Sequence, residues 1–144
     1  MKLFATLLVG AWAFLQAGAA ELTWTTDLPK AIEKAKAEKK LVLIDFTGSD
    51  WCGWCIKLKD EVFSKPEFAE YAQKNLVPVE IDFPRKKQQS AELKKANAEL
   101  AKKYGIRGYP TIVVLDGQGK KVGQLGYMKG GPKAFIGEVE KLKK

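Results

Sequence analysis

The sequence predicts one domain of the α/β class, with a central mixed β-sheet and helices on both faces. Apolar runs at 41–46 and 76–82 are typical of buried strands, and they alternate with amphipathic segments of helical period. Further on, strand-like runs at 111–115 and 121–125 flank a tight turn, which favours an antiparallel hairpin at the sheet edge. The length of 144 residues suits a single domain.

The first twenty residues have a character of their own, which predicts a signal peptide at 1–20 and a mature domain at 21–144. Met1 and Lys2 give a positive start, 3–15 is largely apolar, and small residues follow up to Ala20. A membrane anchor is the alternative, but the apolar run is shorter than the ~20 residues that span a bilayer. We therefore expect export to an oxidising compartment, where disulfides persist.

The elements of the mature part can be placed in order. We expect strands at 22–25, 41–46, 76–82, 111–115 and 121–125, and helices at 28–39, from the two cysteines to about 64, from 66, at 90–104 and from 132. Asp27 and Ser90 are residues that cap helix N-termini. Pro78 fits its strand poorly because proline cannot donate to a ladder, so a bulge or a later strand start is expected there.

The net charge of the chain does not by itself identify a class of binding partner. The formal net charge is +8, from 25 Lys and Arg against 17 Asp and Glu. The lysines are scattered along helical segments, and arginine, the better reader of bases, occurs only at positions 85 and 107. This pattern indicates a solvated basic surface, and we expect no nucleic-acid partner.

Cys52 and Cys55 carry the chemistry that the sequence predicts. They are the two cysteines of the chain, three residues apart, after a strand and a turn and at the start of a helix. The first turn of a helix has unpaired N–H groups and the positive end of the macrodipole, which favour a thiolate at Cys52. Cys55, one turn further on, can attack a mixed disulfide formed by Cys52.

Other uses of two cysteines remain open at this point. A structural disulfide would close a very short loop, which gives little stabilisation. A closed zinc site needs more protein ligands than two thiols provide, and the chain has no histidine. No metal ligands are therefore assigned. Cu(I) binding by two thiolates stays an alternative.

Four segments in order resemble the thioredoxin superfamily. They are the strand with an aspartate at 41–46, the Trp-Cys-Gly-Trp-Cys sequence at 51–55, the Ile-Arg-Gly-Tyr-Pro-Thr passage at 106–111, and the hairpin that ends before Gly126. The resemblance covers nearly the whole mature chain. It is similar in particular to exported thioredoxin-like domains, of which the periplasmic C-terminal domain of the thiol:disulfide interchange protein DsbD is one.

The resemblance implies a thioredoxin-like fold and roles for individual residues. Cys52 would be the exposed attacking thiol, Cys55 the more buried resolving thiol, and Asp45 a buried acid beneath Cys55 that moves its proton. A structural, hydrogen-bonded carboxylate is the alternative for Asp45. An aspartate in so apolar a strand should have a raised pKa through desolvation.

The same resemblance implies a surface for substrates. Pro110 would follow a cis bond and place the backbone of Tyr109 beside an extended substrate. Trp51 would shield the site and contact clients, with a plain core role as the alternative. Gly53 and Trp54, between the cysteines, would tune the reduction potential, with Trp54 partly exposed.

Two of the departures from thioredoxin concern the buried acid. The stretch from Asp45 to Cys52 is one residue longer, and the lysine that accompanies the aspartate in thioredoxin is replaced by Pro78. We therefore expect no lysine at that place to tune Asp45.

The function expected from these residues is an exported thiol–disulfide oxidoreductase, in the periplasm or secreted, that acts as a protein-disulfide reductase or isomerase. Its partners would be protein thiols and disulfides and a membrane redox partner, and it would be a monomer with no cofactor beyond its dithiol. A non-catalytic binding module with the same fold, or a Cu(I)-handling dithiol protein, are the alternatives.

Overall fold

The computed structural model describes residues 22–144, so the expected signal peptide at 1–20 lies outside the described residues. Five α-helices and four strands are formed in that range. They are α1 (Leu28–Glu38), β1 (Leu41–Thr47), α2 (Gly53–Leu58), α3 (Pro66–Asn75), β2 (Leu76–Asp82), α4 (Ala91–Lys103), β3 (Thr111–Leu115), β4 (Lys121–Leu125) and α5 (Gly131–Glu140). A π-helical turn, Lys59–Phe63, continues α2.

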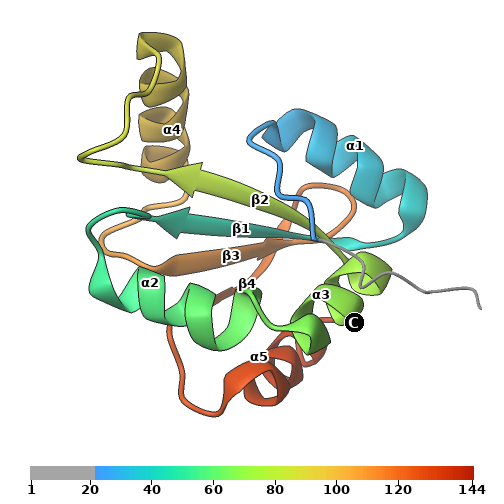
Figure 1. Cartoon of the computed structure of the whole chain (residues 1–144). Helices are drawn as coiled ribbons and strands as arrows, with labels where there is room; N and C mark the ends of the chain where they lie inside the picture. Colours follow the sequence, from blue (N-terminus) through green and yellow to red (C-terminus); the bar gives the residue numbers. More distant parts are fainter. Residues whose placement is uncertain (1–21) are drawn as a thin grey trace, which may run out of the picture.

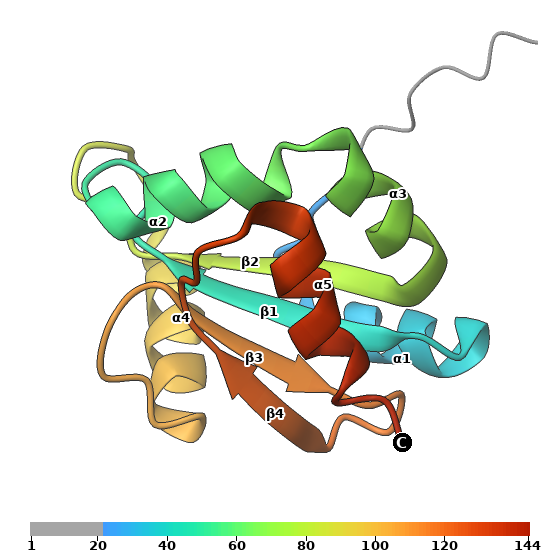
Figure 2. The same cartoon turned by 90° about the horizontal axis from the view of Figure 1, so that it is seen from below.

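The strands form a single mixed sheet in the order β2-β1-β3-β4. β1 runs parallel to β2 and antiparallel to β3, and β3 and β4 form the expected antiparallel hairpin. Helices α1 and α4 cover one face, and α2, α3 and α5 cover the other (Figures 1 and 2). The predicted α/β class with helices on both faces is thus confirmed. No helix within residues 22–144 is long and apolar enough to span a bilayer.

Each face of the sheet has its own apolar core, and alternation along β1 decides what lies in each. Val42, Ile44 and Phe46 point to the face covered by α1 and α4, where they are fully buried. Leu43 points to the opposite face, against α2 and α3. Because side chains alternate along a strand, Asp45 shares the face of Leu43 and lies under the helix that begins at the cysteines.

Pro78 corrects one expectation. β2 begins at Leu76, and Pro78 pairs with Leu43 in register without a bulge. The carbonyl of Pro78 accepts a hydrogen bond from Thr25 N (3.1 Å), on the side away from β1. The nitrogen of Pro78 faces the same side. The N–H that proline lacks is therefore not needed for the hydrogen bonds between β1 and β2. The strand expected at 22–25 was wrong in extent, because only Thr25 forms a bridge, to Val79.

The helix starts agree with the predicted caps. The side chain of Asp27 accepts from Lys30 N (3.1 Å), and Ser90 Oγ accepts from Leu93 N (3.1 Å). The buried residue of α4 is Asn97, whereas Ala96 is exposed. Asn97 is buried because it packs against the end of β2, where its Nδ2 donates to the carbonyl of Asp82 (3.0 Å).

Candidate active site

Cys52 and Cys55 form a disulfide at the N-terminus of α2, with their Cα atoms 5.2 Å apart. Cys52 is the N-cap residue: its N–H donates to the carbonyl of Gly48 (2.9 Å), and its sulfur accepts from Cys55 N (3.2 Å). An N–H that already points at Cys52 Sγ would stabilise a thiolate there once the bond is reduced. The helix start thus provides the donor that the chemistry needs.

The two cysteines differ less in exposure than expected. In the disulfide form Cys52 is 7% exposed and Cys55 is 5% exposed, so both are buried. The prediction of an exposed Cys52 is therefore corrected for this state. The N-cap position turns the Cys52 sulfur inward toward the first turn of α2, where it accepts its hydrogen bond.

The loop before the cysteines is tied to the end of β2 and the residues beyond. Ser49 donates from both its backbone N–H (2.9 Å) and its hydroxyl to the carboxylate of Asp82. The Asp50 carboxylate accepts from the backbone N–H groups of residues 85–87 at 2.8–2.9 Å. These bonds, that from Arg85 first, lower the pKa of Asp50. The loop before the cysteines is therefore an anchored turn.

Trp51 and Tyr109 come together beside the disulfide. Trp51 Nε1 donates to the carbonyl of Phe83 (2.7 Å), and the rings of Trp51 and Tyr109 meet edge to face at 5.8 Å. The Arg85 guanidinium lies 3.7 Å from the centre of the Trp51 ring. The Tyr109–Pro110 bond is cis, as predicted. These contacts give Trp51 a positioning partner on the loop that leads into β3.

The residues between the cysteines face outward. Trp54 is 57% exposed, and its ring packs against Tyr127 with centroids 4.9 Å apart. Lys57 Nζ lies 5.2 Å from the Trp54 ring, and the Tyr127 hydroxyl donates to Glu61 (2.7 Å). A Cβ on Gly53 would meet nothing within 4 Å, so packing alone does not require glycine there. Tyr127 carries no signal in the sequence beyond its place after Gly126, so its contact with Trp54 could not be predicted.

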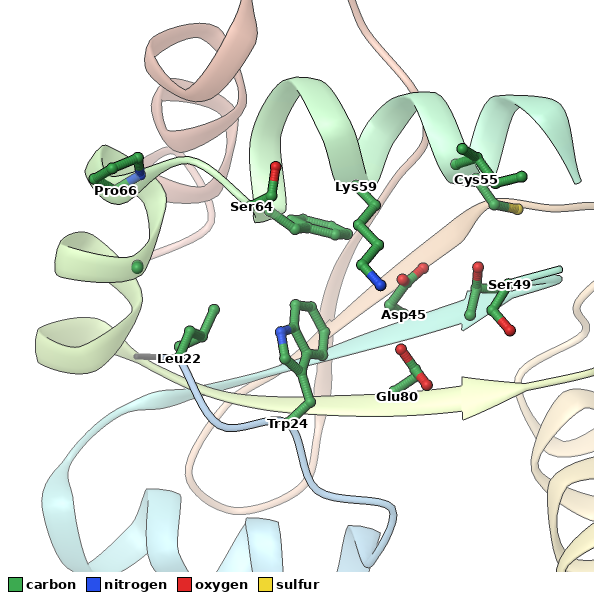
Figure 3. A pocket seen from close by; sticks show the side chains of 13 residues that line it. Leu22, Trp24, Asp45, Ser49, Cys55, Lys59, Ser64, Pro66 and Glu80 are labelled. Atoms are coloured by element: carbon green, nitrogen blue, oxygen red, sulfur yellow. The ribbon is translucent and has the colours of Figure 1, made fainter. Parts of the chain in front are cut away.

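Asp45 lies beneath Cys55 in a cavity of about 660 Å³. Figure 3 shows its carboxylate between the helix of Cys55 and the strand that carries Glu80. Asp45 is 8% exposed, and its Oδ1 has no hydrogen-bond partner. Burial, and then the nearby charges of Glu80 and Asp82, raise the pKa of Asp45 to about 8. A buried acid with this pKa suits proton transfer near neutral pH.

A lysine reaches this acid from another element, although none stands at the strand position held by Pro78. Lys59, from the π-helical turn, extends its ammonium group into the cavity toward Asp45 (Figure 3). Its charge lowers the pKa of Asp45, against the larger effects of burial and of the acidic neighbours. This lysine extends from the π-helical turn above the sheet and not from β2, the strand that carries Pro78. Within residues 22–144 no cluster of side chains suited to a metal ion occurs.

Gly48 is required by the close approach of Trp51, which suggests a test of the loop. A Cβ at this position would lie 2.4 Å from Cε2 of Trp51. We expect Gly48→Ala to displace the indole and to cost about 1–3 kcal/mol of unfolding free energy. Denaturant unfolding followed by tryptophan fluorescence measures this cost. Gly53→Ala, where the space is open, is the matched control, and equal stability of the two variants would contradict the packing shown.

Comparison with known proteins agrees with this geometry. Residues 28–143 match the family of thioredoxin-like domains. The disulfide bond reductase DsbH of Chlamydia pneumoniae is 38% identical over 122 residues, which cover 85% of this chain and 73% of that protein. The thioredoxin-related protein DsbJ of the same organism is 30% identical over 105 residues, but this chain spans only 30% of its length.

Solved structures give the same fold. A DsbH oxidoreductase superposes with a TM-score of 0.82 at 35% identity, with 92% of each chain covered. The oxidised C-terminal domain of Neisseria meningitidis DsbD superposes with a TM-score of 0.61 at 21% identity, covering 84% of this chain and all of that one (100%), which supports the fold alone. The chain therefore belongs to the thioredoxin-like domain family, and its Cys52–Cys55 pair is that of a thiol–disulfide oxidoreductase.

Proposed function

We propose that this oxidoreductase reduces disulfides of exported proteins, with Cys52 as the attacking thiol, Cys55 as the resolving thiol and Asp45 as the proton acceptor. The observation that carries the proposal is the Cys52–Cys55 disulfide at a helix start with a buried acid of raised pKa beneath it. The name of a relative, disulfide bond reductase, supports the reductive direction over isomerisation.

In the first step the Cys52 thiolate attacks one sulfur of a client disulfide. The client S–S bond breaks, a mixed disulfide forms between Cys52 and the client, and the second client sulfur leaves as a thiolate. The N–H of Cys55 and the positive end of α2 favour the attacking thiolate. Trp51, Tyr109 and Pro110 would hold the client chain beside Cys52, and Gly53 and Trp54 would set the potential of the pair.

In the second step Cys55 resolves the mixed disulfide. The Cys55 thiol gives its proton to Asp45, and the resulting thiolate attacks the sulfur of Cys52. The Cys52–Cys55 disulfide forms, and the remaining client sulfur leaves as a thiolate that takes a proton from solvent. Two electrons have then passed from the protein dithiol to the client, and no cofactor is consumed.

The cycle needs a partner that reduces the disulfide again. We infer that this partner is a dithiol protein, for which a membrane redox protein is the natural source outside the cytoplasm. Residues 1–20 would act as a signal peptide that directs the chain, as a monomer, to the periplasm. Mass spectrometry of the exported protein is expected to find an N-terminus at Glu21 or one residue earlier, and an intact Met1 would contradict this.

The reduction potential tests the direction of the reaction. Equilibration of the Cys52–Cys55 pair against glutathione and dithiothreitol buffers is expected to give a value near or below about −230 mV, in the range of reducing relatives. A value near −120 to −150 mV would make the protein a disulfide donor instead. Stoichiometric Cu(I) binding without reduction of insulin would favour the copper-handling alternative.

A further inference from the structure

A second carboxyl group lies beside Asp45 in the cavity. Glu80, on β2, pairs in register with Asp45 on β1, and both side chains line the cavity under Cys55 (Figure 3). Neighbouring strands are about 4.8 Å apart, and directly paired residues of a parallel ladder share one face of the sheet. Glu80 is only half-buried, so the two acids form a path from the buried sulfur toward solvent.

The charges that act on Asp45 come from β2 and from the π-helical turn. From β2 come Glu80 and, two residues further on, Asp82; from the π-helical turn comes Lys59. Lys87 acts on Glu80 from the loop after β2. The other surroundings are uncharged: Ile112 pairs with Asp45 on β3, and the chain before α1 places Leu22 and Trp24 in the wall. Apart from Cys55, which gains charge when it is deprotonated, these are the groups that face the pair.

Asp45 alone is a poor acceptor for the Cys55 proton at neutral pH. With a pKa of about 8, it already holds a proton at pH 7. The pKa of Glu80 is raised as well, by burial first and then by Asp82, while Lys59 and Lys87 act to lower it. Two adjacent acids do not both ionise readily, and they titrate as a pair. A pair that holds one proton keeps one carboxylate free to take another.

We propose that Asp45 and Glu80 form a proton relay for Cys55, in which Lys59 keeps Glu80 ionised as the outer acceptor. The proposal rests on the role of Asp45 given above. Asp45 takes the proton of Cys55 as its own proton passes to Glu80, directly or through water in the cavity. Glu80 then releases that proton to solvent, so one proton leaves the site for each Cys55 thiolate formed. Glu80 and Lys59 are positioning residues, because neither contacts the reacting sulfurs.

The test measures the resolving step alone. The reduced protein is mixed with a peptide disulfide, and the decay of the trapped mixed disulfide is followed by quench flow from pH 5 to 9. Simple electrostatics predicts that Glu80→Gln speeds resolution at pH 7, because the loss of a like charge lowers the pKa of Asp45. The relay predicts the opposite result, a slowing of about tenfold or more, since the outer acceptor is gone.

Further variants separate the relay from a structural effect. Lys59→Met should also slow resolution at pH 7 and move the inflection of the pH profile to higher pH, because both acids lose a stabilising cation. Glu80→Asp should restore part of the rate, which a packing defect would not. The first step, attack by Cys52, should keep its rate in all three. Glu92→Gln and Lys94→Met, on the exposed face of α4, are matched controls and should behave as the wild type.

The possible outcomes distinguish the two proposals. An unchanged or faster resolving step in Glu80→Gln would overturn the relay while Asp45 keeps its role. An unchanged resolving step in Asp45→Asn would overturn the role of Asp45, and the relay with it. Slowing in Asp45→Asn, Glu80→Gln and Lys59→Met, with recovery in Glu80→Asp, would support both.

Discussion

Cys52→Ser is expected to abolish disulfide reduction, with a fall of at least about 10³-fold in turnover of insulin. A serine hydroxyl at the N-cap of α2 can still accept the hydrogen bond from Cys55 N, so the helix start should be preserved. It cannot form a mixed disulfide, however, because oxygen does not replace sulfur in the exchange. Retained activity in Cys52→Ser would contradict the assignment and favour a binding module.

Cys55→Ser gives the contrasting result that makes this test specific. Its Cys52 can still attack, but no second thiol is present to release the client. The variant should therefore accumulate a mixed disulfide with the client, visible by mass spectrometry and reversed by dithiothreitol. If instead Cys52→Ser traps the client through Cys55, the attacking and resolving roles are exchanged. Both variants lack the disulfide, so their stabilities should be compared with that of the reduced wild type.

Asp45→Asn is expected to change the pH dependence of stability. The folded protein holds the Asp45 proton with a pKa of about 8, whereas an unfolded chain holds it with the ordinary aspartate pKa of 3.8. The folded state therefore binds more protons between these values, and the wild type loses stability as pH rises from about 4 to about 8. The loss from this group has a limiting slope of ~1.4 kcal/mol per pH unit.

Urea unfolding at several pH values measures this effect. Asparagine does not ionise, so Asp45→Asn should lack the slope and should gain stability relative to the wild type as pH increases. The same variant should slow the resolving step by at least about 10²-fold, because the proton acceptor is lost. A parallel pH dependence of the two proteins would show that Asp45 is not a buried acid with a raised pKa. Asp60→Asn, on an exposed aspartate, is the control.

The periodicity of apolar residues was sufficient for the fold class, for the four strands of the sheet and for most helix boundaries, but not for 22–25, where only Thr25 forms a bridge. β1, β3 and β4 are apolar runs of strand length between turn residues, and Asp27 and Ser90 cap helices through local hydrogen bonds. Such signals depend on residues close in sequence, and for that reason they can be recognised without the structure. Pro78 misled the prediction, because its effect depends on whether its nitrogen faces β1 or the opposite side of β2.

The sequence by itself determined the chemistry of this protein: two cysteines at a helix start, an aspartate in an apolar strand, and a proline that the structure places after a cis bond. Only the tertiary structure decided what surrounds them. Glu80 reaches Asp45 through the parallel pairing of two strands, and Lys59 reaches it from a helix packed above the sheet. Contacts between residues distant in sequence depend on register and packing, which local patterns do not specify.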